Sequence, residues 1–143
     1  MAIEYNRRMM QYWFDPVAES FEEPYWEAIK RKKLVFQRCK ECGKWSHPPR
    51  VMCDKCNSSD MEWVESSGKG KIYSYVVFTR EAHPTFKVPY EVVLVEMENE
   101  EGVRIISNME DCTPDEVYIG MPVEVVFVDV TDEWPLPFFK KAE

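Results

Sequence analysis

The chain has 143 residues, of which 45% are apolar and 14% aromatic, which is enough for one ordinary domain or two small ones. Its net charge is −8, and the whole acidic surplus falls in residues 68–143, which carry fifteen acidic side chains against seven basic ones. This charge disfavours nucleic acid as a partner of that half, since a phosphate backbone would be repelled. No apolar run approaches the ~18 residues of a membrane span.

Residues 1–33 are expected to be helical, with a break at Asp15-Pro16 and a second helix from about Pro24 to Lys33. Around the first helix, apolar side chains cover roughly 200° of the circumference, about twice the arc that one core needs. Such a helix is either buried within this chain's own fold or held between this chain and a partner, and the second alternative suits a small chain better. The candidates for a partner interface are Tyr5, Met9, Tyr12, Trp13, Phe14, Trp26, Phe138 and Phe139.

Residues 34–67 hold four cysteines between two predicted strands, residues 34–37 and 61–66. The cysteines form two pairs, each with two intervening residues: Cys39 with Cys42, and Cys53 with Cys56. Two such turns aim four sulfur atoms at one point, which is the tetrahedral site that zinc accepts, and Gly43 permits the positive φ that such a turn often needs. Because four protein ligands leave no position open for water, we expect one structural zinc ion per chain.

Two alternatives remain for the four cysteines. Iron would accept the same four sulfur atoms, so the spacing does not exclude it. Redox dithiols or disulfides are less favoured, because the start of the chain lacks the pattern of a secretory signal, and we therefore expect a cytoplasmic protein whose cysteines stay reduced.

From residue 68 onward the pattern changes to strands rich in Val, Ile, Tyr and Phe, predicted at residues 71–80, 90–98, 103–109 and 121–129. Residues 99–102 are an expected hairpin loop, and residues 113–119 a short turn or strand. Curled antiparallel strands in so short a chain favour a small closed barrel, at residues 68–130, over a sandwich. The tail, residues 131–143, is proline-rich around Trp134, so we expect it to lack regular structure and to pack on a surface of this chain or of a partner.

Candidates for catalysis are few. Cys112, outside the pairs, lies beside acidic residues that would raise the pKa of its thiol, which favours a plain loop cysteine. His47 is expected at the surface, with an outer neighbour of the metal site as the alternative, and His83 in a loop. The sequence has no nucleotide-binding loop, dinucleotide fingerprint or nucleophile elbow. It therefore predicts a protein without catalytic activity of its own.

Over about residues 24–140 the order of motifs resembles the DUF35 family. The resemblance rests on residues 34–43, 47–50, 53–56, 68–75, 93–96, 119–123 and 136–139. It implies a mainly β protein with N-terminal helices, in which a rubredoxin-like zinc ribbon at residues 34–67 precedes an OB-fold barrel at residues 68–130. The four cysteines carry over as metal ligands, and no catalytic residue carries over.

The resemblance also implies a function. Members of the family typically act as small accessory subunits, so we expect a hetero-oligomer with a thiolase-like catalytic subunit and acyl-CoA at or near the shared interface. The aromatic N-terminus would suit thiolytic cleavage of an aromatic 3-oxoacyl-CoA such as benzoylsuccinyl-CoA. The alternatives are an accessory subunit of an acyl-CoA hydratase or aldolase, a stand-alone acyl-CoA-binding protein and, least favoured because of the acidic charge, a nucleic-acid-binding barrel.

Overall fold

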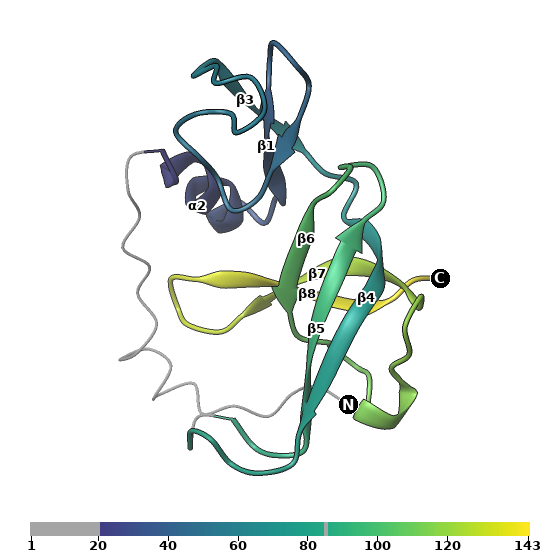
Figure 1. Ribbon diagram of the computed structural model, residues 1–143. Coiled ribbons are helices and arrows are strands. Elements are labelled where there is room, and N and C mark those ends of the chain that lie inside the picture. Colours follow the sequence, from purple (N-terminus) through teal and green to yellow (C-terminus); the bar gives the residue numbers. More distant parts are fainter. Residues whose placement is uncertain (1–20, 85) are drawn as a thin grey trace.

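The computed structural model describes residues 21–84 and 86–143, and the statements below refer to them. Figure 1 shows two parts: an upper ribbon part (residues 21–67) with one helix and short strands, and a lower barrel part (residues 68–143) of longer strands. The first predicted helix, with Tyr5, Met9, Tyr12, Trp13 and Phe14, lies outside the described residues. Among the described residues, no helix has the length and apolar character needed to cross a membrane.

Helix α2 (Glu23–Lys30) confirms the second predicted helix. Pro24 suits its first turn, where the backbone N–H groups have no helical partner to lose. The helix ends before the predicted Lys33, because Lys32 enters the left-handed region with a φ of 58° and the Lys33 N–H donates to the Ala28 carbonyl oxygen at 2.9 Å. The residues that it buries are Tyr25, Ala28 and Ile29.

Three antiparallel strands form the sheet of the ribbon part, in the order β2-β1-β3. Their bounds are β1 (Val35–Cys39), β2 (Trp45–Ser46) and β3 (Met61–Glu65). The two predicted strands at residues 34–37 and 61–66 are confirmed, and β1 runs on to the first cysteine. Strand β2 was not predicted, because two residues are too few to show an alternating pattern.

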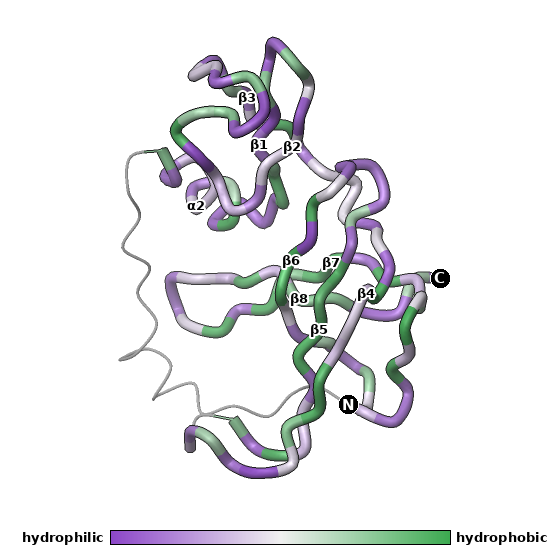
Figure 2. Tube along the Cα trace, viewed as in Figure 1, coloured by the Kyte–Doolittle hydropathy of each residue, from purple (hydrophilic) through white to green (hydrophobic). Residues whose placement is uncertain are grey.

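Five antiparallel strands form a curled sheet in the barrel part, in the order β6-β5-β4-β7-β8. Their bounds are β4 (Lys69–Phe78), β5 (Tyr90–Met97), β6 (Arg104–Ser107), β7 (Pro122–Asp129) and β8 (Pro135–Lys141). The four predicted strands are thereby confirmed, and the predicted turn contains the 3-10 helix η1 (Pro114–Glu116). Apolar residues run along β5 and β6, as Figure 2 shows, and Val93, Val95 and Ile105 of these strands lie in the buried core.

The two outer strands of this sheet meet and turn it into a small, partly open barrel. Met109, just after β6, pairs in parallel with Phe139 of β8. The Phe139 N–H donates to the Asn108 carbonyl oxygen at 3.0 Å, and the Glu110 N–H donates to the Phe139 carbonyl oxygen at 2.7 Å. This strand order and this closure are those of an OB-fold, so the predicted fold class is confirmed.

The predicted lack of regular structure in the tail is wrong, because residues 135–141 form β8 and pair with β7. Pro135 and Pro137 are tolerated because β8 is an edge strand. The Phe139 N–H points away from β7, toward Asn108, and the alternation of a strand puts both proline nitrogens on that same side. The two prolines therefore remove no hydrogen bond between β8 and β7.

The ribbon part and the barrel part share one hydrophobic core. Ile29 of α2 and Phe36 of β1 belong to the same buried cluster as Ile72, Val95 and Phe139 of the barrel. Because burial of each such side chain contributes about 1.5–3 kcal/mol, the two parts stabilise each other.

Gly70 allows β4 to lie close to β5 at the start of the barrel. A Cβ atom at this position would lie 2.5 Å from the Glu96 carbonyl oxygen and 2.8 Å from the Val95 side chain. Any residue with a side chain would push the two strands apart. Glycine is therefore required here by this contact and not by its backbone angles.

Candidate metal centre

The first pair of cysteines lies in the turn between β1 and β2. Cys39 is the last residue of β1, and its carbonyl oxygen accepts a hydrogen bond from the Gly43 N–H at 2.9 Å. The Cys39 N–H donates to the Lys44 carbonyl oxygen at 2.8 Å and closes the turn. Gly43, which follows Cys42, has a φ of 77°, the left-handed conformation expected from the sequence.

The second pair, in the loop between β2 and β3, repeats this turn. The Cys53 carbonyl oxygen accepts from the Asn57 N–H at 3.0 Å, and the Cys53 N–H donates to the Ser58 carbonyl oxygen at 2.8 Å. Asn57 follows Cys56 as Gly43 follows its own pair, and its φ is 61°. Asparagine is one of the few residues that adopt this conformation readily. The sequence reasoning missed Asn57, although its position directly after a cysteine pair was the available signal.

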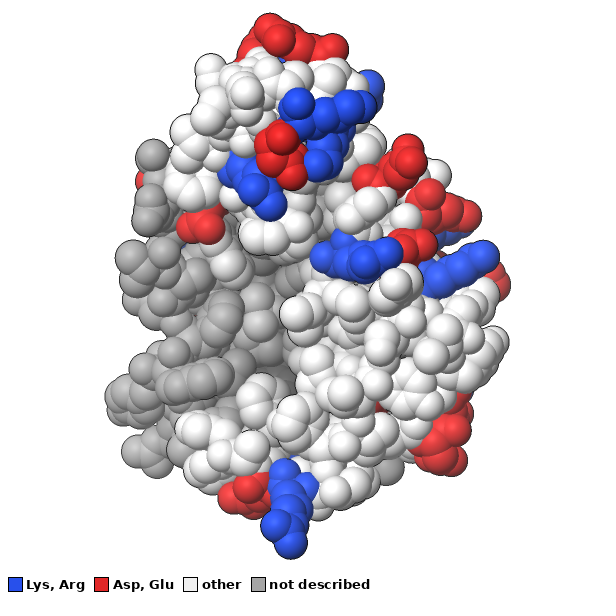
Figure 3. Space-filling view, in the orientation of Figure 1, with Lys and Arg blue, Asp and Glu red and all other residues white. Residues whose placement is uncertain are grey.

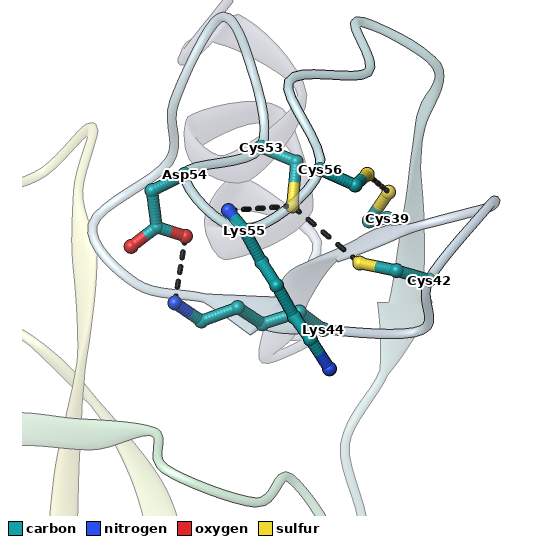
Figure 4. Close-up of polar contacts among 7 residues, drawn as sticks. All are labelled: Cys39, Cys42, Lys44, Cys53, Asp54, Lys55 and Cys56. Atoms are coloured by element: carbon teal, nitrogen blue, oxygen red, sulfur yellow. Dashed lines mark hydrogen bonds and ion pairs between the residues drawn. The ribbon is translucent and has the colours of Figure 1, made fainter.

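The two turns bring the four sulfur atoms of the predicted ligands together (Figure 4). All four Sγ atoms lie within 4.8 Å of one another, with Cys39 to Cys56 at 3.6 Å and Cys42 to Cys53 at 3.5 Å. Around a zinc ion, a Zn–S bond of about 2.3 Å gives a tetrahedron with S–S edges of roughly 3.8 Å. The cluster therefore has the size and the donor set of a metal site with four sulfur ligands.

The surroundings of the cluster favour metal binding. The backbone N–H groups of Cys56 and Lys55 lower the pKa of the Cys53 thiol to about 7, whereas burial and the neighbouring thiols raise the pKa of Cys56 to about 12. Four thiols packed this closely cannot all ionise without a cation among them, and a bound metal would supply that charge. On the surface, Lys44 Nζ donates to Asp54 Oδ1 at 2.7 Å and links the two turns (Figure 4). Four protein ligands leave no coordination position for a substrate, so the arrangement is that of a structural site.

His47 is half-buried, whereas the sequence predicted a surface position. Its ring packs against the rings of Phe36, with centroids 5.1 Å apart, and Tyr25, at 5.6 Å. The packing of α2 against β1 creates this environment, and sequence spacing alone does not reveal it. Burial lowers the pKa of His47 to about 4, so the imidazole is neutral at pH 7. Its nitrogen atoms are not part of the sulfur cluster.

The remaining candidates for catalysis lie apart from the metal site. His83 lies in the loop between β4 and β5, as predicted. Cys112 follows β6, as expected for a loop cysteine, but its side chain is buried in the shared core. Burial and the nearby Glu116 carboxylate raise the pKa of its thiol, so this cysteine is a weak nucleophile.

A cleft of about 450 Å³ opens between the ribbon part and the barrel part. Helix α2 contributes Tyr25 and Trp26 to its lining, the loop after β2 contributes His47, and β8 contributes Phe138. Two of the candidate interface residues, Trp26 and Phe138, thus line the same cleft. Phe139 is fully buried in the core of this chain. Contact of any of these residues with a partner stays a prediction.

Two family models match consecutive stretches of the chain. The first, described as "ChsH2, rubredoxin-like zinc ribbon domain", matches residues 26–62. The second, described as "ChsH2, C-terminal OB-fold domain", matches residues 63–128. Fold and metal site together define a protein in which a zinc ribbon precedes an OB-fold barrel.

The chain is 40% identical over 111 residues to a DUF35 domain-containing scaffold protein of Methanocaldococcus jannaschii, covering 76% of this chain and 77% of that protein. It belongs to the DUF35 family. It is also 41% identical over 122 residues to a probable enoyl-CoA hydratase alpha subunit of Thermomonospora curvata, covering 85% of this chain but only 38% of that protein's length.

A solved structure described as "Ltp2-ChsH2(DUF35) aldolase" contains a chain with the same fold. The identity is 39% and the TM-score 0.83, and the alignment covers 90% of this chain and 100% of that chain. At this identity and coverage the likeness extends over both the ribbon part and the barrel part.

Proposed function

We propose that this chain is a non-catalytic accessory subunit of an enzyme complex acting on acyl-CoA, with a hydratase or an aldolase as its catalytic partner. The observation that carries the proposal is the alignment with the whole of the DUF35 chain in the Ltp2-ChsH2(DUF35) aldolase, at a TM-score of 0.83. The similarity to a probable enoyl-CoA hydratase alpha subunit and to a scaffold protein supports the same role. A closed metal site and a buried cysteine of raised pKa suit a supporting rather than a chemical role.

The proposed metal is zinc, one ion per chain, held by Cys39, Cys42, Cys53 and Cys56. A set of four thiolates is typical of structural zinc sites and unsuited to cations that prefer oxygen ligands. Binding of zinc contributes about 10–16 kcal/mol in zinc-finger peptides, which would stabilise a ribbon whose own sheet is small. A reducing, cytoplasmic compartment would keep the four sulfur atoms free for the metal.

The cleft between the ribbon part and the barrel part is the proposed contact of this chain with an acyl group. Its walls include apolar surface from Trp26, Leu136 and Phe138. An apolar group that packs against this surface leaves water, which is favourable. Arg104 also lines the cleft, but its Nε already pairs with Glu96 Oε2 at 3.1 Å. We therefore propose that the phosphates of CoA are bound by the catalytic subunit.

A thiolase-type catalytic partner and an aromatic substrate such as benzoylsuccinyl-CoA stay predictions. The relatives reported above are described as hydratase, aldolase and scaffold proteins. For this reason the hydratase or aldolase role is the leading proposal.

Co-purification tests the proposal. The full chain, tagged and produced in its own organism at native level, is isolated, and the proteins bound to it are identified by mass spectrometry and assayed with acyl-CoA substrates. We expect a stoichiometric hydratase or aldolase subunit whose activity stays with the complex. Recovery of a thiolase would favour the predicted thiolase partner instead, and a chain that purifies alone would overturn the accessory role.

A further inference from the structure

The outward side of β4, β5 and β6 is apolar. The register places Val76 opposite Val92 and Leu94 opposite Ile106, so these side chains share one side of the sheet. Val76 is 55% exposed and Ile106 is 73% exposed. The apolar face, as we call it, consists of Val76, Phe78, Tyr90, Val92, Leu94 and Ile106.

The apolar face has a shape that can receive a side chain. A shallow hollow of about 210 Å³ lies among Val76, Leu94 and Ile106. At one end the rings of Phe78 and Tyr90 stack with centroids 5.0 Å apart. Aromatic rings beside a preformed hollow are the features at which interface energy usually concentrates.

Charged side chains border the apolar face and are missing from it. Figure 3 shows a broad uncharged surface over β4, β5 and β6, with side chains of both signs above it. At that border Arg104 pairs with Glu96 across β5 and β6, at 3.1 Å, and lies 3.8 Å from the Tyr73 ring. An apolar centre with a charged rim is the usual anatomy of a protein–protein interface. The uncharged area contrasts with the acidic surplus of residues 68–143 as a whole.

Part of the apolar face lies on a pair of strands that has little support from the rest of the sheet. β4 pairs with β7 only over Lys69, Gly70 and Lys71, and β5 pairs with β6 only from Val93 onward. Residues 76–78 and 90–92 therefore pair only with each other among the described strands. An isolated pair of strands is marginally stable in water, so a partner surface that covers this pair would stabilise it.

We propose that the apolar face is where the catalytic subunit docks, through an apolar, uncharged surface of its own. This inference rests on the proposed function and names the surface that serves it. The strands in question are those with which OB-folds bind oligonucleotides, but the apolar face offers no lysine or arginine to a phosphate backbone, which points to a protein. A second copy of this chain would bring a second net charge of −8 to the same contact, which disfavours it as the occupant.

The test uses the full chain with zinc bound and the catalytic subunit that co-purifies with it. Ile106→Asp and Val76→Asp each place a charge in the centre of the apolar face at an exposed position. Ile119→Asp is the matched control, because Ile119 is 68% exposed and lies in the loop before β7, outside the apolar face. Ile106→Ser is a milder variant that adds no charge. Zinc content and melting temperature are measured for each variant.

We expect Ile106→Asp and Val76→Asp to weaken the affinity for the catalytic subunit by about 30-fold or more, and Ile119→Asp to leave it unchanged. Ile106→Ser, with an unchanged melting temperature, should still weaken it by about 10-fold. Unchanged affinity in all three apolar-face variants would overturn the docking surface while the proposed function stands. If the variants lost self-association but bound the catalytic subunit as tightly as the wild type, the apolar face would be a contact between two copies of this chain. That result would overturn the proposal. A wild-type chain that binds no catalytic subunit would overturn both.

Discussion

The indole ring of Trp134 lies edge-on to the indole ring of Trp26, with centroids 5.6 Å apart and ring planes at 82°. Trp26 belongs to α2, whereas Trp134 directly precedes β8, so this pair joins the ribbon part to the barrel part. The ammonium group of Lys30 lies 4.4 Å from the centroid of the Trp134 ring and adds a cation–π contact from the same helix.

Replacing Trp134, which is buried, should therefore weaken the whole molecule. Trp134→Ala is expected to lower the free energy of unfolding by about 3 kcal/mol or more, because the indole leaves a cavity at the contact. In a double-mutant cycle with Trp26→Ala, the coupling energy should be about 1 kcal/mol. Urea unfolding of the zinc-bound chain measures both values, with the exposed Tyr118→Ala as control. Additive effects of the two tryptophan changes would show that the rings do not couple.

The metal site predicts a sharp difference between two cysteines. Cys53→Ser should lose zinc and leave the ribbon part sensitive to protease, because three thiolates and a hydroxyl make a poorer site. Cys112→Ser should keep one zinc per chain, because Cys112 lies outside the cluster. Elemental analysis of freshly purified protein gives both results. A wild-type protein that folds without any bound metal would contradict the assignment.

Glu91 predicts a dependence of stability on pH. Its side chain is 1% exposed, Oε1 has no hydrogen-bond partner among the described residues, and burial raises the pKa of the carboxyl group above its usual range. The contribution of this group to stability is fully present below its unfolded pKa of about 4.3 and is lost as the pH rises through the higher folded pKa.

Glu91→Gln should remove this dependence. From about pH 4.5 to about pH 8, the free energy of unfolding of the variant should rise relative to that of the wild type. Urea unfolding at a series of pH values provides the measurement, and Glu101→Gln, in the exposed hairpin loop, is the control. Parallel pH curves for wild type and Glu91→Gln would be inconsistent with a raised pKa.

The close approach of β4 and β5 predicts the cost of a single methyl group. Gly70→Ala should destabilise the barrel by about 1–3 kcal/mol, because the added Cβ meets the Glu96 carbonyl oxygen. Ser74→Ala, at an exposed position on the same strand, should change stability by no more than about 0.5 kcal/mol. Thermal unfolding compares the two variants, and equal melting temperatures would argue against the contact.

The charge of the barrel part predicts weak binding of nucleic acid. We expect no binding of single-stranded DNA tighter than about micromolar at physiological salt, since few cations are present to displace counterions. Fluorescence anisotropy with a labelled oligonucleotide measures this. Tight, salt-sensitive binding would contradict the argument from charge.

Features that depend on neighbouring residues could be predicted from the sequence. The spacing of Cys39, Cys42, Cys53 and Cys56 brings four sulfur atoms together because each pair forms its own turn. The strands β4 to β7 follow from stretches of Val, Ile, Tyr and Phe long enough to show a pattern.

Features that depend on distant residues could not be predicted. β8 was missed because Pro135 and Pro137 argue against a strand unless its edge position is known. The partial burial of His47 depends on α2 packing over β1. The apolar face was also missed, because alternation along β5 shows that two sides exist and not which of them the chain itself covers.

The closure of the barrel through Phe139 has a consequence for the order in which the chain folds during synthesis. All four cysteines of the cluster and the three strands of the ribbon sheet are complete by Glu65, whereas the pairing of Met109 with Phe139 needs residues made much later. A nascent chain can therefore take up its metal and form the ribbon while the barrel is still an open sheet. Strand β8, which is made after the ribbon and after β4 to β7, is the one that closes the barrel.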